Sequence, residues 1–203
     1  MKRLTRVESQ ERTRALIVQA AARLFLRDGF GVTSLEQVAE EAGFTRGAVY
    51  SNFESKTAMG IAVIDELYAR EERRLVVALA DAVDGGLDAW FDVLSNWADS
   101  TIGDPDWTRL EIEIAASSAH DPAHRAASAA RYARQRALCV QLLKERFGDS
   151  LPVDGETMAA VIIGLGLGIG LQRAADPSVP GTIWSETLRT LAEGARRQTE
   201  VTS

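Results

Sequence analysis

The sequence predicts an all-α fold of about nine helices, in which a small N-terminal domain precedes a larger helical one. Apolar residues recur at i, i+3, i+4 and i+7 along much of the chain, which is the spacing of one helix face. The dipeptide Asp-Pro at 104–105 and at 121–122 stands before two such segments, where it supplies an N-cap followed by proline at the first helical position. With 203 residues and 46% hydrophobic content, the chain can bury a substantial core.

The first helix is predicted over residues 13–28. Leu16, Ala20 and Leu24 lie on one helical face of this segment. Gly29 follows the last apolar position, and glycine is the residue that most often ends a helix. The helix is therefore expected to stop before Phe30.

The second helix is predicted to begin near Ser34. Thr33 and Glu36 have the T-x-x-E spacing of a capping box, in which hydroxyl and carboxylate satisfy backbone donors at a helix start. Gly43 closes the helix, because glycine can adopt the left-handed conformation that turns the chain sharply. Thr45 is expected to cap the next helix. The apolar face comprises Leu35, Val38, Ala39 and Ala42.

A short third helix is predicted over residues 45–52, with Val49 as its single inward-facing residue. A helix of about seven residues is a rod about 10 Å long, which fits across a major groove about 12 Å wide. Its polar side chains offer donors to phosphates and base edges. The pattern therefore indicates a DNA-reading helix-turn-helix over residues 33–52, the alternative being a surface helical hairpin with no partner.

Lys56 lies in the first turn of a fourth helix, predicted over residues 55–82 with Ser55 as its N-cap. A lysine at a helix N-terminus opposes the helix macrodipole. Its position needs another explanation, and a phosphate beside it would be one.

Caps, glycines and core aromatics fall in one register from Thr13 to Lys56: T-R-x-x-I-x-x-A-A-x-x-L-F-x-x-x-G-F-x-x-T-S-L-x-x-V-A-x-x-A-G-F-T-x-G-A-V-Y-x-N-F-x-S-K. This pattern resembles the DNA-binding domain of the tetracycline-repressor (TetR) family. The resemblance implies a three-helix DNA-binding domain over residues 10–70 and a helical ligand-binding and dimerisation domain over 71–203. Many family members have histidine where this chain has Asn52. The implied DNA contacts are Thr33, Ser34, Thr45, Arg46, Gly47, Ala48, Tyr50, Ser51, Asn52 and Lys56.

The resemblance also implies a function. It predicts a ligand-responsive transcriptional repressor that binds a palindromic DNA operator as a homodimer and is released by a small apolar or amphipathic inducer. An activator, or a helical protein-interaction module without an inducer, is the alternative. An enzyme is not expected, because the sequence offers no nucleophile–base arrangement.

The middle helices concentrate aromatic residues, which suit either an ordinary core or a ligand pocket between helices. Such a pocket is mostly apolar, with a few polar groups that orient the ligand. Because TetR-like proteins usually bind an inducer here, the resemblance favours the pocket. Its candidate residues are Trp90, Phe91, Trp97, Trp107, Arg109, Glu111, Glu113 and His120.

His120 and His124 stand four residues apart, a spacing that can hold a metal on one helix. Asp121-Pro122 lies between them and starts a helix, so the two histidines are expected to straddle its boundary. We therefore interpret the motif as a helix cap, and we expect no metal and no cofactor.

The segment 158–171 reads MAAVIIGLGLGIGL and is predicted to be a helix that packs at a dimer interface. Its alternation from Gly164 onward also suits a strand, and its glycines lack the spacing of a phosphate loop. Fourteen apolar residues are too few for a membrane span. In the resembling family the last two large helices pair across a two-fold axis. The candidate interface residues are Ile162, Leu165, Gly168, Ile169, Trp184, Leu188 and Leu191.

Charge is unevenly distributed along the chain, whose net charge is −6. Residues 1–56 contain nine Lys/Arg and seven Asp/Glu, whereas the remainder contains fourteen and twenty-two. DNA affinity must then come from a few placed contacts rather than a general basic field. Lys2, Arg3 and Arg6 form either an arm that reaches DNA or a solvated tail. The single Cys139 excludes an intramolecular disulfide and fits a cytoplasmic protein.

Overall fold

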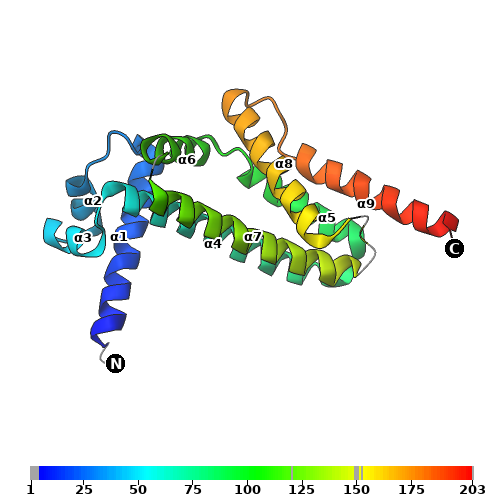
Figure 1. Cartoon of the computed structure of the whole chain (residues 1–203), viewed down its shortest axis with the longest axis horizontal. Coiled ribbons are helices and arrows are strands. Elements are labelled where there is room, and N and C mark those ends of the chain that lie inside the picture. Colours follow the sequence, from blue (N-terminus) through cyan, green and yellow to red (C-terminus); the bar gives the residue numbers. More distant parts are fainter. Residues whose placement is uncertain (1–4, 120, 149–150, 152, 203) are drawn as a thin grey trace. The chain divides into compact units, whose positions relative to one another are not determined.

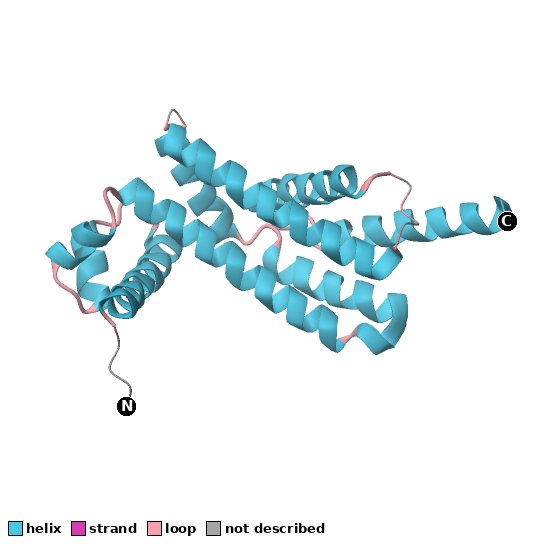
Figure 2. Ribbon diagram, turned by 60° about the horizontal axis from the view of Figure 1, so that its bottom comes forward, coloured by secondary structure: helices cyan, strands magenta, loops and turns pink. Residues whose placement is uncertain are grey.

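The computed structural model describes residues 5–119, 121–148, 151 and 153–202, and these residues form α-helices and one 3-10 turn but no strand (Figures 1 and 2). The predicted all-α fold is confirmed for this part of the chain. Its elements are α1 (Arg6–Asp28), α2 (Leu35–Ala42), α3 (Arg46–Asn52), α4 (Lys56–Asp81), η1 (Val83–Gly85), α5 (Gly86–Thr101), α6 (Pro105–Ser118), α7 (Pro122–Phe147), α8 (Gly155–Ala175) and α9 (Ile183–Thr202).

The helices gather into two compact units. The described residues of Met1–Arg70 and Arg109–Ala127 form the first unit, and those of Glu71–Thr108 and Ser128–Ser203 form the second. The first unit thus contains a segment of α6 and α7 that is distant in sequence from the helix-turn-helix. The sequence pattern did not indicate this segment, because it reports local structure and not tertiary contacts.

Helix α1 begins earlier than the sequence pattern predicts. Thr5 caps it in a capping box with Glu8: the Thr5 hydroxyl accepts from the Glu8 amide at 3.2 Å, and the Glu8 carboxylate accepts from the Thr5 amide at 2.7 Å. The residues after this cap are mostly polar, so they carry no apolar periodicity although they are helical. The helix ends at Gly29, as expected.

The two helix starts predicted at 104–105 and 121–122 are confirmed. Asp104 accepts the Trp107 amide at 2.8 Å at the start of α6, and Asp121 accepts the Ala123 amide at 2.8 Å at the start of α7. The interpretation of Asp121 as a cap therefore holds, and His124 lies in the first turn of α7. His120 lies outside the described residues.

The core of the second unit is built mainly from α5, α8 and α9. The indole Nε1 of Trp184 donates to the Ile162 carbonyl at 2.9 Å, which ties α9 to α8. Ser95 on α5 donates to the buried Ser185 hydroxyl on α9 at 2.8 Å. The buried apolar residues of this core are Leu79, Phe91, Leu94, Ala98, Ile102, Leu143, Ile162, Ile169, Trp184 and Leu188.

Helix α8 confirms the helical interpretation of the glycine-rich segment, and it is longer than predicted. It spans 21 residues. By length and composition alone, this described helix could cross a membrane. Of its most apolar 18-residue stretch, 17% is buried inside the protein. Gly170 and Gly166 pack closely, because an added Cβ would lie 3.3 Å from the Gly103 amide nitrogen and 3.4 Å from Trp184 Nε1 respectively. An added Cβ on Gly164 or Gly168 would meet no atom within 4 Å.

Replacing Trp184 by phenylalanine is expected to destabilise the protein more than replacing Trp97. The two rings pack on one another at 5.7 Å, and Trp97 Nε1 has no hydrogen-bond partner among the described residues. Both substitutions remove the same atoms, but only Trp184→Phe removes a hydrogen bond, which contributes about 1 kcal/mol. Thermal unfolding should show Trp184→Phe melting about 2–4 °C below Trp97→Phe. Equal melting temperatures would contradict a stabilising role for this bond.

Cys139 is expected to react slowly in the folded protein. Burial raises the pKa of its thiol from an ordinary 9.0 to about 11, which lowers the thiolate fraction at neutral pH about 100-fold. Because a thiolate of higher pKa is also more nucleophilic, alkylation with iodoacetamide, followed by mass spectrometry, should be about 10-fold slower in native than in urea-unfolded protein. Similar rates would show that the thiol is accessible.

Candidate DNA-binding site

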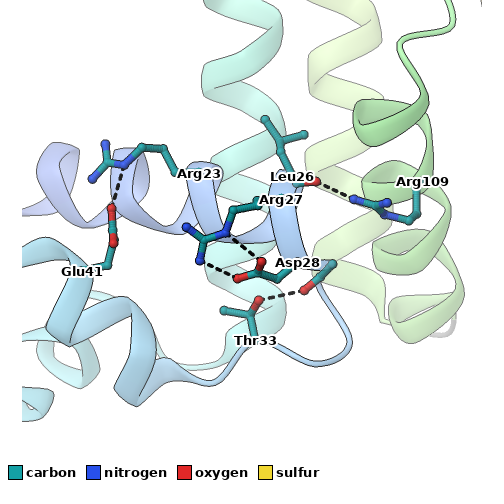
Figure 3. Close-up of polar contacts among 8 residues, drawn as sticks. Arg23, Leu26, Arg27, Asp28, Thr33, Glu41 and Arg109 are labelled. Atoms are coloured by element: carbon teal, nitrogen blue, oxygen red, sulfur yellow. Dashed lines mark hydrogen bonds and ion pairs between the residues drawn. The ribbon is translucent and has the colours of Figure 1, made fainter.

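Helix α2 is capped at its N-terminus by Ser34, one residue after Thr33, which the sequence pattern predicted as the cap. The Ser34 hydroxyl accepts from the Gln37 amide at 3.2 Å, and the Gln37 side chain accepts from the Ser34 amide at 2.7 Å. The prediction of a capping box between Thr33 and Glu36 is therefore wrong. Thr33 is 3% exposed and its hydroxyl donates to the Gly29 carbonyl at 2.8 Å (Figure 3). Its side chain is thus directed into the protein, while Ser34 stands at the surface.

Helix α3 is presented to solvent on all sides but one. Val49 is its buried residue, and Thr45 caps it by accepting from the Ala48 amide at 3.2 Å, as predicted. Gly43, in the left-handed conformation at φ +70°, makes the turn between α2 and α3. The predicted reader therefore has a fixed start and a single anchor in the core.

Two side chains of α3 extend from its exposed face. The guanidinium of Arg46 forms an ion pair with Glu36 on α2 at 2.6 Å and lies 5.5 Å from the centre of the Tyr50 ring. These contacts raise the Arg46 pKa, first through Tyr50 and then through Glu36. Both Arg46 and Tyr50 are exposed, so an incoming phosphate or base edge can reach them.

Ser51 and Asn52 turn back onto the helix. The Ser51 hydroxyl donates to the Ala48 carbonyl at 2.9 Å, and the side-chain Nδ2 of Asn52 donates to the same oxygen at 2.8 Å. Asn52 is half-buried, whereas Ser51 is exposed. Gly47 and Ala48 carry no bulky side chain, so the backbone beside them is open to close approach.

Lys56 is engaged within the protein. Its Nζ donates to the Gly31 carbonyl at 3.0 Å and lies 4.7 Å from the centre of the Phe30 ring. Burial lowers the Lys56 pKa, and the nearby Glu113 carboxylate partly offsets this effect. The ammonium group has three donors, so it can keep this bond and still meet a phosphate.

The Lys56→Ala variant tests whether the Lys56 ammonium contacts a DNA phosphate or only stabilises the protein. If the ammonium neutralises a DNA phosphate, its loss should lower the slope of log affinity against log salt by about one per chain. Fluorescence anisotropy titrations from 50 to about 200 mM salt would measure that slope. Weaker DNA binding with an unchanged slope would show that Lys56 stabilises the protein and contacts no phosphate.

Two residues predicted for the ligand pocket instead contact the α1–α2 region of the first unit. Arg109 on α6 donates to the Leu26 carbonyl in the last turn of α1 (Figure 3). Glu113, one turn further along α6, accepts from the Gly31 amide at 2.9 Å. No local pattern indicates these contacts, since Leu26 and Arg109 are 83 residues apart.

The other predicted pocket residues divide between the units. Phe91 is buried, and Trp90 packs edge-on against both Phe91 and Phe147 at 5.1 and 5.9 Å. Trp97 and Trp107 also belong to the second unit, whereas Glu111 belongs to the first. The predicted pocket residues are thus divided between the two units.

The predicted interface residues also divide: Gly168 and Leu191 are exposed, Leu165 is half-buried, and the other four are buried. Ile162, Ile169, Trp184 and Leu188 are buried in the core of the second unit, so their side chains are not available to a partner. The prediction that these four residues lie at a dimer interface is therefore wrong, because the packing of α8 and α9 directs their side chains into the core and directs other residues to the surface. The exposed side of α8 comprises Val161, Gly164, Leu167, Gly168 and Leu171, and that of α9 includes Ile183, Thr187 and Leu191.

Within the described ranges, no group of three or more His, Cys, Asp or Glu side chains is placed to hold a metal ion. The candidate DNA-binding site offers hydrogen-bond donors, positive charge and an exposed helix. These are the means by which proteins contact DNA.

Two family models match the chain. Residues 17–63 match the model of bacterial regulatory proteins of the tetR family, and residues 89–195, more than half of the chain, match the C-terminal domain of BetI-type transcriptional repressors. The chain belongs to the TetR family. It is therefore a DNA-binding transcriptional regulator and not an enzyme.

Individual curated relatives match part of this TetR-family chain. The transcriptional regulator TtgR of Pseudomonas putida is 46% identical over 68 residues, which are 34% of this chain and 32% of TtgR. This chain thus spans about a third of the length of that curated relative.

Solved structures share the fold over most of the chain. FadR of Thermus thermophilus, a TetR-family repressor solved in complex with lauroyl-CoA, has a TM-score of 0.63 and 24% identity, with 89% of this chain and 94% of FadR covered. A protein from Saccharomonospora viridis solved in complex with choline has a TM-score of 0.67 and 18% identity, with coverages of 90% and 96%. At these identities, the two structures establish the fold alone.

Proposed function

We propose that this TetR-family protein is a ligand-responsive repressor that binds a palindromic operator as a homodimer in the cytoplasm. The observation that carries the proposal is α3, a short helix that is anchored by Val49 and exposes Arg46, Gly47, Tyr50 and Ser51. Arg46 and Tyr50 extend from it, and Ser34 stands at the start of the neighbouring helix. Such a surface suits a major groove, with phosphate contacts that position it and side chains that read bases.

The exposed apolar side of α8 supports a homodimer. Val161, Leu167 and Leu171 are exposed, and Gly164 and Gly168 on the same side have open space above them. The helix is apolar enough for a lipid environment, yet most of its apolar window is unburied within one chain. A second copy that packs its own α8 and α9 on this surface would remove it from water, and small residues allow helices to approach closely.

Two copies also improve DNA recognition. One α3 of seven residues makes a small contact, whereas two copies related by a two-fold axis contact two half-sites of an inverted repeat. The modest positive charge of the N-terminal residues makes this pairing more important, because bulk electrostatics contributes little.

An apolar or amphipathic small molecule is the effector we propose. The BetI-type model covers most of the second unit, and a protein of this fold was solved with lauroyl-CoA, an amphipathic ligand. An effector that binds better to a conformation with badly spaced reading helices would shift the protein off DNA. An activator would use the same reading surface, and its effector would favour the DNA-bound conformation instead.

Selection of bound fragments from random and genomic DNA tests the function. The purified protein should enrich an inverted repeat, and its affinity should fall steeply with added salt. Sequence-independent recovery of fragments would argue against an operator-binding regulator. No recovery at low salt would favour a protein-interaction module that has kept the helix-turn-helix as a scaffold.

A further inference from the structure

The turn between α1 and α2 is held by α6 through a carboxylate. Gly31, in the middle of that turn, has both of its backbone polar groups bonded to side chains: its amide donates to Glu113 Oε2 at 2.9 Å and its carbonyl accepts from Lys56 Nζ at 3.0 Å. The Gly29 backbone, at φ +101°, lies against the same carboxylate, since an added Cβ would be 3.5 Å from Glu113 Oε1.

We propose that Glu113 is a positioning residue for DNA binding, which fixes the Gly29–Thr33 turn and keeps Lys56 at the start of α4. This inference rests on the proposed function, because it concerns the same DNA-binding surface. The turn ends at Ser34, the N-cap of α2, and α2 packs on α3. A displaced turn would therefore displace the cap and, through α2, the reading helix.

Glu113 also acts on Lys56 through charge. Its carboxylate is close enough to raise the Lys56 pKa, while the Phe30 ring covers the ammonium from another side. Together these groups confine the ammonium to the side of the turn where Gly31 accepts it. A confined lysine loses less side-chain entropy when it meets a phosphate.

The position of α6 does not depend on the carboxylate. Leu110 and Ile114 are fully buried in the first unit. Gly60 on α4 has no room for a side chain there, because an added Cβ would lie 2.8 Å from Ile114 Cδ1 and 2.9 Å from the Phe30 ring. Arg109 makes a polar contact to the Leu26 carbonyl, and its guanidinium also lies 3.8 Å from the Glu113 carboxylate, so the buried apolar contacts are what hold α6 when that carboxylate is removed. Removing the Glu113 carboxylate should thus free the turn and leave α6 in place.

Glu113→Ala and Glu113→Gln separate the hydrogen bond from the charge. Both remove one negative charge, but glutamine keeps an oxygen that can accept the Gly31 amide. Glu111→Ala is the matched control, because it makes the same charge change two residues earlier, about 200° around α6. The duplex recovered in the DNA selection is the probe.

Hydrogen exchange of a peptide covering residues 29–34 reports the turn, and anisotropy with the selected duplex reports DNA affinity. We expect Glu113→Ala to speed exchange at Gly31 about 10-fold and to weaken DNA binding about 5- to 10-fold, the effect of losing one charge-assisted hydrogen bond. Glu113→Gln should recover most of both, and Glu111→Ala should change neither by more than about 2-fold. Melting temperatures within a few degrees of wild type would show that each variant folds.

Several results would overturn the proposal. Exchange at Gly31 that is as slow in Glu113→Ala as in wild type would show that the carboxylate does not hold the turn. Unchanged DNA affinity in Glu113→Ala, or equal loss in the Glu111→Ala control, would show that the turn does not position the reader. A wild-type protein that binds no DNA would instead refute the proposed function, while the exchange measurement would still decide whether Glu113 holds Gly31.

Discussion

Leu171→Glu is expected to convert the protein to monomers and to abolish binding to an inverted-repeat operator. Leu171 is 58% exposed on the apolar side of α8, next to Gly168, where we propose that a second copy packs. A two-fold interface would contain the substitution twice, so two carboxylates would have to be buried without partners. Each monomer would keep its reading helix but would reach only one half-site.

Light scattering after gel filtration and a gel-shift titration measure the two consequences. Val77→Glu is the matched control, because Val77 is similarly exposed, at 61%, and lies on α4, which is not part of the proposed interface. The control should remain dimeric and bind DNA as wild type does. A Leu171→Glu protein that stays dimeric would place the interface elsewhere.

Tyr50→Ala is expected to weaken operator binding by about 30-fold or more in the dimer. A specific contact at a base or its phosphate contributes about 1–3 kcal/mol, and a dimer loses it at both half-sites. Tyr50 is 48% exposed and its ring contacts Arg46 rather than the core, so the fold should be unaffected. The loss should therefore appear in DNA affinity and not in melting temperature.

Fluorescence anisotropy titrations with the selected duplex, at one fixed salt concentration, measure the change in DNA affinity caused by Tyr50→Ala. Tyr50→Phe separates the two parts of the side chain: it should retain binding if the ring supplies the contact and lose it if the hydroxyl does. Affinity unchanged in Tyr50→Ala would remove α3 from the reading surface as we have assigned it.

Local signals in the sequence predicted the helix ends well. Asp104 and Asp121 cap their helices as expected, and Gly43 turns the chain in the left-handed conformation. Each of these residues acts on backbone groups a few positions away, so its effect can be inferred from neighbours alone. The cap of α2 was misplaced because the T-x-x-E and S-x-x-Q patterns are offset by only one residue, and burial of Thr33 decides between them.

The side of α8 that faces the core was harder to predict. Its central residues are leucine, isoleucine and glycine, so no polar position marks the solvent-facing side. Ile162 and Ile169 turned inward, and Leu171 turned outward. Only the packing of Trp184 and Gly103 against α8 settles this choice, and such contacts are absent from the local pattern.

The roles of Arg109 and Glu113 were missed for a related reason. Polar residues next to an aromatic-rich segment suggested a ligand pocket, but their partners are backbone atoms of Leu26 and Gly31. A backbone partner leaves no trace in the sequence, because any residue type can supply it.

The spacing of the two half-sites tests the central claim most directly. Once an inverted repeat has been selected, about five base pairs inserted at its centre rotate one half-site about half a helical turn away from the other. A two-fold dimer with two reading helices should then bind at least about 100-fold more weakly. An insertion of a full helical turn should weaken binding less than the half-turn insertion, although it is longer, because it restores the relative orientation of the half-sites. Equal affinity for the original duplex and the half-turn insertion would contradict a dimer that reads both half-sites together.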